Sequence, residues 1–240
     1  MTGASAVSWA ASRQQAASRM DGLRGRAGEI FMGHRFAELA LTDGVKALQL
    51  AKGSRAAYAR LERGPDSHDR LGPDELSFIA GRDGFSMASA LETGWPYVHF
   101  RGGRPGFFHA LNDRTLDFAD FRGNRQYVTA ANLLHDGRVS LFLRDYPHQR
   151  RLKVLGRATV ASIDDAPQLV DPSYPAHVER TILISVEAFD WNCPQHIRPR
   201  FTPDELAEAL ALLRQKIAEL KAENAHLQGL PNSRAEESAS

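Results

Sequence analysis

Hydrophobic and polar positions alternate with a period of two in several short segments, which is typical of strands with one buried face. Turn residues such as Thr93-Gly94 and Asn112-Asp113 separate these segments at hairpin spacing. We expect about six strands with a helix inserted after the fourth, an arrangement typical of a closed barrel. Gly156 is expected to form a bulge in the longest segment. The alternating segments are 85–91, 96–101, 107–111, 115–120, 139–143, 152–163 and 181–189.

Helical patterns flank these segments. Residues 28–61 predict two short helices broken near Gly53, and residues 73–80 predict a helix with acidic residues in its first turn. A cluster of Gly, Pro, Asp and His residues over 62–72 indicates a loop. A further helix is expected over 126–134, with its free N–H groups aimed at the preceding turn. We therefore expect an N-terminal lead and helical arm over 1–72 and a barrel domain over 73–201.

The C-terminal region predicts a long helix over 202–228. Thr202, Pro203 and Glu205 supply a capping hydroxyl, a first-turn proline and a capping-box carboxylate, so the helix is expected to begin at Pro203. Apolar residues then follow the 4-3 spacing of a coiled coil. Residues 229–240 are polar without periodicity and predict a disordered tail. The spaced positions are Leu206, Leu210, Leu213, Ile217, Leu220, Asn224 and Leu227.

This pattern predicts a homodimer, with two orientations open. Asn224 falls at an a position, where a single polar residue favours a parallel pair in register. Lys216 would face Lys221 of a parallel partner, and this repulsion argues against that orientation. The alternative is that the apolar stripe packs on the chain's own barrel or N-terminal helices.

Composition restricts the function classes. The 240 residues carry 30 Lys and Arg against 29 Asp and Glu, so no overall field attracts nucleic acid or an anionic membrane. One cysteine excludes an internal disulfide, which is typical of a cytoplasmic protein. No apolar run is long enough to span a membrane, and the first twenty residues are typical of a disordered or amphipathic lead.

Two glycine-bearing, arginine-rich turns carry the candidate chemistry. They are Arg101-Gly102-Gly103-Arg104 and Arg122-Gly123-Asn124-Arg125. Glycine allows close approach of the main chain to a ligand, and arginine forks match phosphate oxygens. The two turns together predict a site for a phosphorylated cofactor.

A family resemblance rests on the order of several motifs. Over roughly residues 78–198 the chain resembles the pyridoxamine 5′-phosphate oxidase-like FMN-binding split barrels. His99-Phe100-Arg101-Gly102-Gly103 stands where the oxidases have arginine, aliphatic residues and lysine, so we carry over the flavin site and not the substrate. The motifs are Thr93-Gly94-Trp95-Pro96-Tyr97, Leu116-Asp117-Phe118-Ala119-Asp120, Gly123-Asn124-Arg125, Arg138-Val139-Ser140-Leu141-Phe142 and Leu152-Lys153-Val154-Leu155-Gly156-Arg157-Ala158.

The resemblance implies a fold and an activity. It implies a mainly β split barrel with flanking helices that binds FMN, as a homodimer whose cofactor lies at the subunit interface. The implied activity is hydride transfer from an unidentified small molecule to the flavin. The residues implied or expected to bind FMN are His99, Phe100, Arg101, Gly102, Phe118, Ala119, Asn124, Arg125, Gln126, Arg151 and Trp191.

Other readings of the same residues stay open. Cys193, three positions before His196, is either a thiolate close to the flavin or a packed and inert cysteine. No histidine pair has the HExxH spacing, so a metal centre is not expected. The rival functions are a non-catalytic binding protein for flavin, deazaflavin or haem, and an assembly module that acts through its C-terminal helix.

Overall fold

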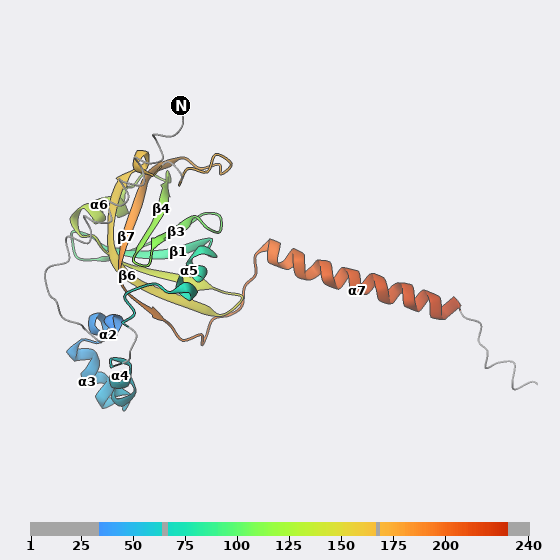
Figure 1. Cartoon of the computed structure of the whole chain (residues 1–240), viewed down its shortest axis with the longest axis horizontal. Coiled ribbons are helices and arrows are strands. Elements are labelled where there is room, and N and C mark those ends of the chain that lie inside the picture. Colours follow the sequence, from blue (N-terminus) through green and yellow to red (C-terminus); the bar gives the residue numbers. More distant parts are fainter. Residues whose placement is uncertain (1–33, 64–66, 167–168, 230–240) are drawn as a thin grey trace, which may run out of the picture. The chain divides into compact units, whose positions relative to one another are not determined.

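The computed structural model describes residues 34–63, 67–166 and 169–229, and its centre is one sheet of seven antiparallel strands (Figure 1). The strands follow the order β2-β1-β5-β6-β7-β4-β3. The mainly β class predicted from the alternation is therefore confirmed. The strand bounds are β1 (Gly84–Ala90), β2 (Pro96–Gly102), β3 (Phe108–Asn112), β4 (Thr115–Phe121), β5 (Arg138–Asp145), β6 (Arg150–Ser162) and β7 (Val178–Trp191).

The sheet does not close on itself. Its outer strands, β2 and β3, are not paired with each other in the described parts of the chain. Strand β3 has only five residues and its register shifts between Ala110 and Asn112, so it offers little regular backbone to a further strand. The split form of the barrel is confirmed, and the prediction of a closed barrel is wrong.

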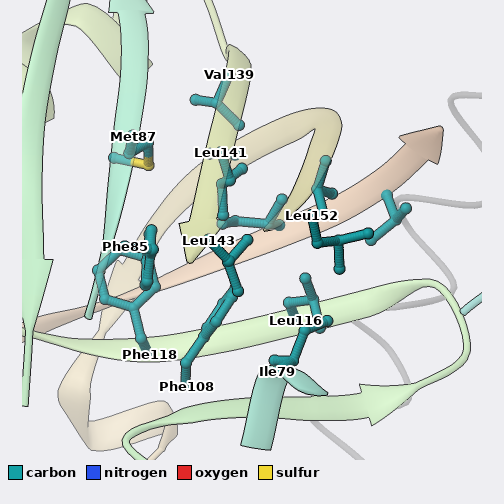
Figure 2. Close-up of a cluster of buried hydrophobic side chains, with 14 of the residues drawn as sticks. Ile79, Phe85, Met87, Phe108, Leu116, Phe118, Val139, Leu141, Leu143 and Leu152 are labelled. Atoms are coloured by element: carbon teal, nitrogen blue, oxygen red, sulfur yellow. The ribbon is translucent and has the colours of Figure 1, made fainter. Parts of the chain in front are cut away.

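Side chains pointing inward from the strands form one buried cluster (Figure 2). Phe85 of β1 lies 4.5 Å from Phe108 of β3 and 5.3 Å from Phe118 of β4, measured between ring centroids. All three side chains are buried. Since β1 and β3 lie toward opposite ends of the strand order, these rings join the two ends of the sheet where hydrogen bonds do not.

Helix α5 (Pro73–Ala80) adds Phe78 and Ile79 to this core and begins at its predicted proline. The carboxylate of Glu75 accepts hydrogen bonds from the Gly72 N–H at 2.8 Å and from Trp191 Nε1 at 2.6 Å. One side chain therefore caps α5 and fixes the end of β7.

The helical arm consists of three short helices. The two helices predicted around Gly53 correspond to α3 and α4, and the separate helix α2 was not predicted. His34 stacks on His68 with ring centroids 3.9 Å apart, and His68 lies 4.9 Å from Phe189 of β7, which anchors the arm to the sheet. The predicted N-terminal lead lies outside the described residues. The bounds are α2 (Arg35–Ala40), α3 (Asp43–Ala51) and α4 (Arg55–Leu61).

Within the described residues, 146–149 and 196–229 form a second unit, which contains helix α7 (Pro203–Gly229). The helix begins at Pro203 as predicted. Thr202 Oγ1 accepts from the Glu205 N–H at 3.3 Å, and the Glu205 carboxylate accepts from the Thr202 N–H at 2.7 Å. Of the helices in the described ranges, none combines the length and apolarity needed to cross a membrane. The predicted tail lies almost entirely outside the described residues.

An irregularity lies opposite Gly156, where a bulge was predicted, but the extra residue is Glu187 of β7 and not a residue of β6. The β6–β7 register shifts between Leu155 and Gly156, and a Cβ atom at Gly156 would lie 2.5 Å from the Ser185 carbonyl oxygen. We expect Gly156→Ala to lower the free energy of unfolding by about 1–3 kcal/mol, because backbone atoms must shift. Urea denaturation measures this change.

Gly44→Ala is the matched control. Gly44 lies in helix α3 with no atom within 4 Å of its added Cβ, so this substitution is expected to be neutral or to stabilise by up to about 1 kcal/mol. Equal losses in both variants would contradict the steric explanation.

Candidate functional site

A cavity of about 320 Å³ is lined by residues from both ends of the strand order. Its walls come from β2, the end of β4, the 122–127 connection, the beginning of helix α6 (Val128–His135) and the beginning of β7. The volume is near the lower limit of about 300–1,000 Å³ for small-molecule sites. Segments far apart in the sequence therefore meet around one opening.

The 122–127 connection has a defined backbone conformation. The side-chain oxygen of Asn124 accepts from the Gln126 N–H at 3.1 Å, forming a local turn. Arg125 and Tyr127 have positive φ angles of 59° and 55°. Because the backbone of Tyr127 is in the left-handed region, α6 begins at Val128, two residues later than predicted.

The first turn of α6 faces the cavity. Val128, Thr129 and Ala130 line it. Tyr127 is the N-cap residue of α6, and its side chain accepts no hydrogen bond from the first turn of the helix. The first N–H groups of a helix lack partners within the helix, and the helix dipole gives them a partial positive charge. This end of the cavity is suited to an anion.

Ion pairs neutralise three of the four arginines around the cavity. Arg101 Nη1 lies 2.5 Å from Asp120, and Arg180 lies 3.5 Å from the same carboxylate. Arg180 also pairs with Glu179 at 2.6 Å, and Arg122 pairs with Glu179 at 2.7 Å. Asp120 and Glu179 are thus each shared by two arginines.

Arg125 is the fourth arginine of the lining, and its side chain is exposed. In the part of the chain that the structure describes, it forms no ion pair, in contrast to Arg101, Arg122 and Arg180. Four arginines and two carboxylates leave an excess of two positive charges. Arg125 therefore supplies a cation next to the free N–H groups of α6.

His99 and Arg101 form the β2 wall. His99 Nδ1 lies 3.2 Å from Thr129 Oγ1, which connects β2 to α6. Burial lowers the pKa of His99, the positive charge of Arg101 lowers it further, and Asp120 acts in the opposite direction. Burial also lowers the pKa of Arg101 against the effect of Asp120, yet a guanidinium stays charged in proteins. The site thus holds a neutral imidazole beside a fixed cation.

Most of the residues expected to bind the cofactor meet at this cavity. Its lining also includes residues that were not predicted, among them Tyr127, Thr129, Glu179 and Arg180. Tyr127 is a half-exposed aromatic residue next to predicted ones and was detectable from the sequence. The predicted residues in the lining are His99, Phe100, Arg101, Gly102, Ala119, Asn124, Arg125 and Gln126.

Three predicted residues lie elsewhere in the chain. Phe118 belongs to the buried core, because it points to the face of β4 opposite Ala119. Arg151 donates hydrogen bonds to the carbonyl oxygens of Cys193 at 2.7 Å and Gln195 at 3.3 Å. Trp191 packs edge-on against the ring of Phe78 at 4.8 Å. Within one chain, none of the three lines the cavity.

Cysteine chemistry was the remaining candidate, and a metal centre was not expected. Cys193 is exposed, so the packed cysteine expected as one alternative is not found. Within residues 34–63, 67–166 and 169–229, no group of three or more His, Cys, Asp and Glu side chains is arranged to hold a metal ion.

Comparisons with known proteins find structural similarity only. No protein-family model and no curated protein matches the chain. The HupZ protein of Group A Streptococcus is 12% identical with a TM-score of 0.42, and the match covers 55% of this chain and 100% of that chain. An FMN-binding protein from Syntrophomonas wolfei is 11% identical with a TM-score of 0.39, covering 60% of this chain and 97% of that chain.

A third similar structure comes from Clostridium acetobutylicum. It is described as related to general stress protein 26 of Bacillus subtilis and as belonging to the pyridoxinephosphate oxidase family. The identity is 11%, the TM-score is 0.38, and the match covers 55% of this chain and 94% of that chain. Solved structures similar to this chain thus include members of the family that the sequence resembles. At such identities the likeness concerns the split-barrel fold alone.

The lowered pKa of His99 predicts a pH dependence of stability. Below the ordinary value of 6.5, the unfolded chain binds a proton that the folded chain does not. The free energy of unfolding is therefore expected to fall as the pH decreases through this value, and to level off below the folded-state pKa. His99→Gln should remove this contribution.

The measurement is urea denaturation of both proteins at about pH 7.5 and about pH 5.5. The difference in unfolding free energy, wild type minus variant, is expected to decrease on acidification. A constant or increasing difference would exclude a lowered pKa at His99.

Proposed function

We propose that this cavity binds FMN and that the protein is an FMN-dependent oxidoreductase acting on a small molecule. The observation that carries the proposal is the position of Arg125, a cation without an acidic partner in the described chain, beside the uncapped beginning of α6. A dianionic phosphate suits both features.

The remaining lining suits the rest of the cofactor. Arg122 and the N–H groups of the 123–128 backbone, apart from that of Gln126, would hold phosphate oxygens together with Arg125. Phe100, Phe107 and Phe121 offer apolar walls to a flat ring, and Phe100 is 62% exposed, so its ring is available to a ligand. When bound, FMN supplies a two-electron acceptor that takes a hydride.

The chain's own residues provide binding and orientation. His99 and Thr129 fix the distance between β2 and α6, and so the width of the opening between them. The pairs of Asp120 with Arg101 and Arg180 hold three side chains of the lining in place. Such order before binding reduces the entropy lost when a ligand is bound.

One observation favours a second candidate, a cofactor-binding protein without turnover. Among the described lining residues, both carboxylates are paired with arginines, and His99 contacts Thr129. The described lining therefore offers no uncommitted carboxylate or imidazole for a substrate proton. The ligand of such a protein would be a flavin, a deazaflavin or haem.

Replacing Arg125 tests the binding site. We expect Arg125→Ala to weaken FMN binding about tenfold or more, because a hydrogen bond to a charged group contributes about 1.5–3 kcal/mol. Quenching of flavin fluorescence during titration measures the dissociation constant.

Arg60→Ala is the control, because Arg60 is an exposed arginine of α4 that does not line the cavity. It removes the same charge and should leave the affinity unchanged. Equal weakening of FMN binding by both variants would show that the effect comes from the net charge of the protein and not from the position of Arg125. A wild-type protein that retains no FMN would exclude the proposal. Reduction of the bound flavin by a substrate or a nicotinamide nucleotide would separate the enzyme from the binding protein.

We also propose that α7 pairs with the α7 of a second copy of the chain. The apolar residues of its 4-3 pattern are exposed, from 44% at Leu210 to 59% at Leu213 and Leu227. An apolar seam of this length is stabilised when a second helix covers it. The parallel orientation that Asn224 favours and the antiparallel orientation that relieves the lysine repulsion both satisfy this requirement.

Two neighbouring leucines provide the test of pairing. Leu213 lies in the seam, whereas Leu212 is 69% exposed and lies outside the 4-3 pattern. We expect Leu213→Asp to reduce the dimer fraction at a given concentration, because a carboxylate would be buried in the seam. Leu212→Asp should have no effect. Sedimentation equilibrium gives the dimer fraction, and the same result for both variants would contradict pairing through this face.

A further inference from the structure

A second cavity, of about 240 Å³, lies beside the first. Phe107, Ala119 and Phe121 line both cavities and form their shared wall. The second cavity also reaches segments that the first does not, namely the 104–106 turn and the 169–174 segment. It therefore has a lining of its own, which the proposed FMN site does not use.

The buried part of this lining is apolar, and its exposed part carries the polar groups. Ala119 and Leu169 are buried, while Phe107, Phe121 and Tyr174 are half-buried. A ligand would therefore leave water mainly by contact with apolar side chains, which is the favourable direction for an apolar molecule. The exposed members of the lining are Arg104, Pro105, His109 and Asp171.

Contacts within the protein fix the aromatic rings of the lining. Phe107 stacks on the core residue Phe85 with ring centroids 5.8 Å apart. The same ring lies against Gly103, where an added Cβ atom would be 2.7 Å from Cγ of Phe107. The rings of Phe121 and Tyr174 have centroids 5.0 Å apart. Rings that are ordered in advance reduce the entropy lost when a ligand binds.

The ionisable groups of the lining already have partners in the protein. Arg104 Nη1 lies 3.0 Å from the Asp171 carboxylate and donates to Ser173 Oγ at 2.7 Å. The Asp171 carboxylate also accepts from the Ser173 N–H at 2.8 Å. His109 Nδ1 lies 3.5 Å from the Asp117 carboxylate. A charged group on a ligand would have to displace one of these contacts.

The lining thus restricts the ligand to a neutral molecule with a flat apolar part. A formal charge of either sign is unfavourable among apolar side chains when no free partner meets it. Aromatic walls favour an aromatic ring, since aromatic pairs add stabilisation beyond the area that they bury. An apolar cavity of about 150 Å³ is large enough for benzene. The larger second cavity therefore suits a substituted benzene or two fused rings, as in indole.

We propose that the second cavity binds a neutral aromatic molecule of one or two rings. The ring of the ligand lies against Phe107, Phe121 and Tyr174, and its edge faces the exposed part of the lining. Binding involves no proton transfer and no change in the charge of a lining residue. The proposal does not depend on FMN binding in the first cavity.

Trifluoromethylbenzene is a suitable probe, because its single fluorine NMR signal broadens when the molecule binds a protein. We expect saturable broadening with the full-length protein, and displacement of the probe by indole. Trifluoromethylcyclohexane, which has a similar size but no aromatic ring, should bind more weakly. Equal affinity of the two fluorinated probes, or no saturable binding of either, would overturn the proposal.

Tyr174 provides the test of the binding wall. Tyr174→Ala should weaken binding of the aromatic probe about tenfold, because one aromatic wall is lost. Tyr174→Leu keeps apolar bulk without the ring and should also weaken it, whereas Tyr174→Phe keeps the ring and should retain wild-type affinity. Tyr58→Ala is the matched control, because Tyr58 is an exposed tyrosine of α4 that lines neither cavity.

Phe100 distinguishes the two cavities, because it lines the first and not the second. Phe100→Ala should leave the affinity for the aromatic probe unchanged. Loss of binding in this variant would place the probe in the first cavity and overturn the proposal. Unchanged binding in both Tyr174→Ala and Tyr174→Leu, with native circular dichroism, would overturn it as well.

Discussion

The pairing of β4 with β7 is the constraint on which the candidate sites depend. Their register sets Asp120 opposite Arg180, while Ala119 lies opposite Thr181 on the same two strands. The inward residues Phe118 and Ile182 are buried in the core, so a slip of one residue would exchange core and surface side chains. Core packing therefore fixes the positions of the charged lining residues as well as the fold.

The arginines of the first cavity illustrate how a site retains positive charge. Partly buried cations such as Arg101 and Arg180 are costly without partners, and these two share Asp120, while the more exposed Arg122 pairs with Glu179. Arg125 avoids this cost because it lies at the surface, on a turn with left-handed backbone. The fixed ion pairs give the cavity its form, and the exposed arginine leaves it with attraction for an anion.

Local patterns in the sequence predicted much of the fold, and contacts between distant segments account for most of what they missed. The strands, α5 and the beginning of α7 follow from alternation and capping residues close in sequence. The lack of closure depends on the short, irregular β3, which alternation does not reveal. Glu179 and Arg180 reach the cavity through pairing with β4, more than fifty residues away. Phe118 was predicted to bind the cofactor together with its neighbour Ala119, but successive residues of a strand point to opposite faces, and Phe118 points into the core.

The shared wall has a consequence for how this protein can change. Phe107, Ala119 and Phe121 line both the first cavity and the second cavity of about 240 Å³, and Ala119 is 5% exposed. A larger side chain at this position would intrude on one cavity or the other, and a smaller aromatic neighbour would enlarge both. Natural variation at these three positions is thus expected to be correlated, because a substitution that changes the volume of one cavity also changes that of the other.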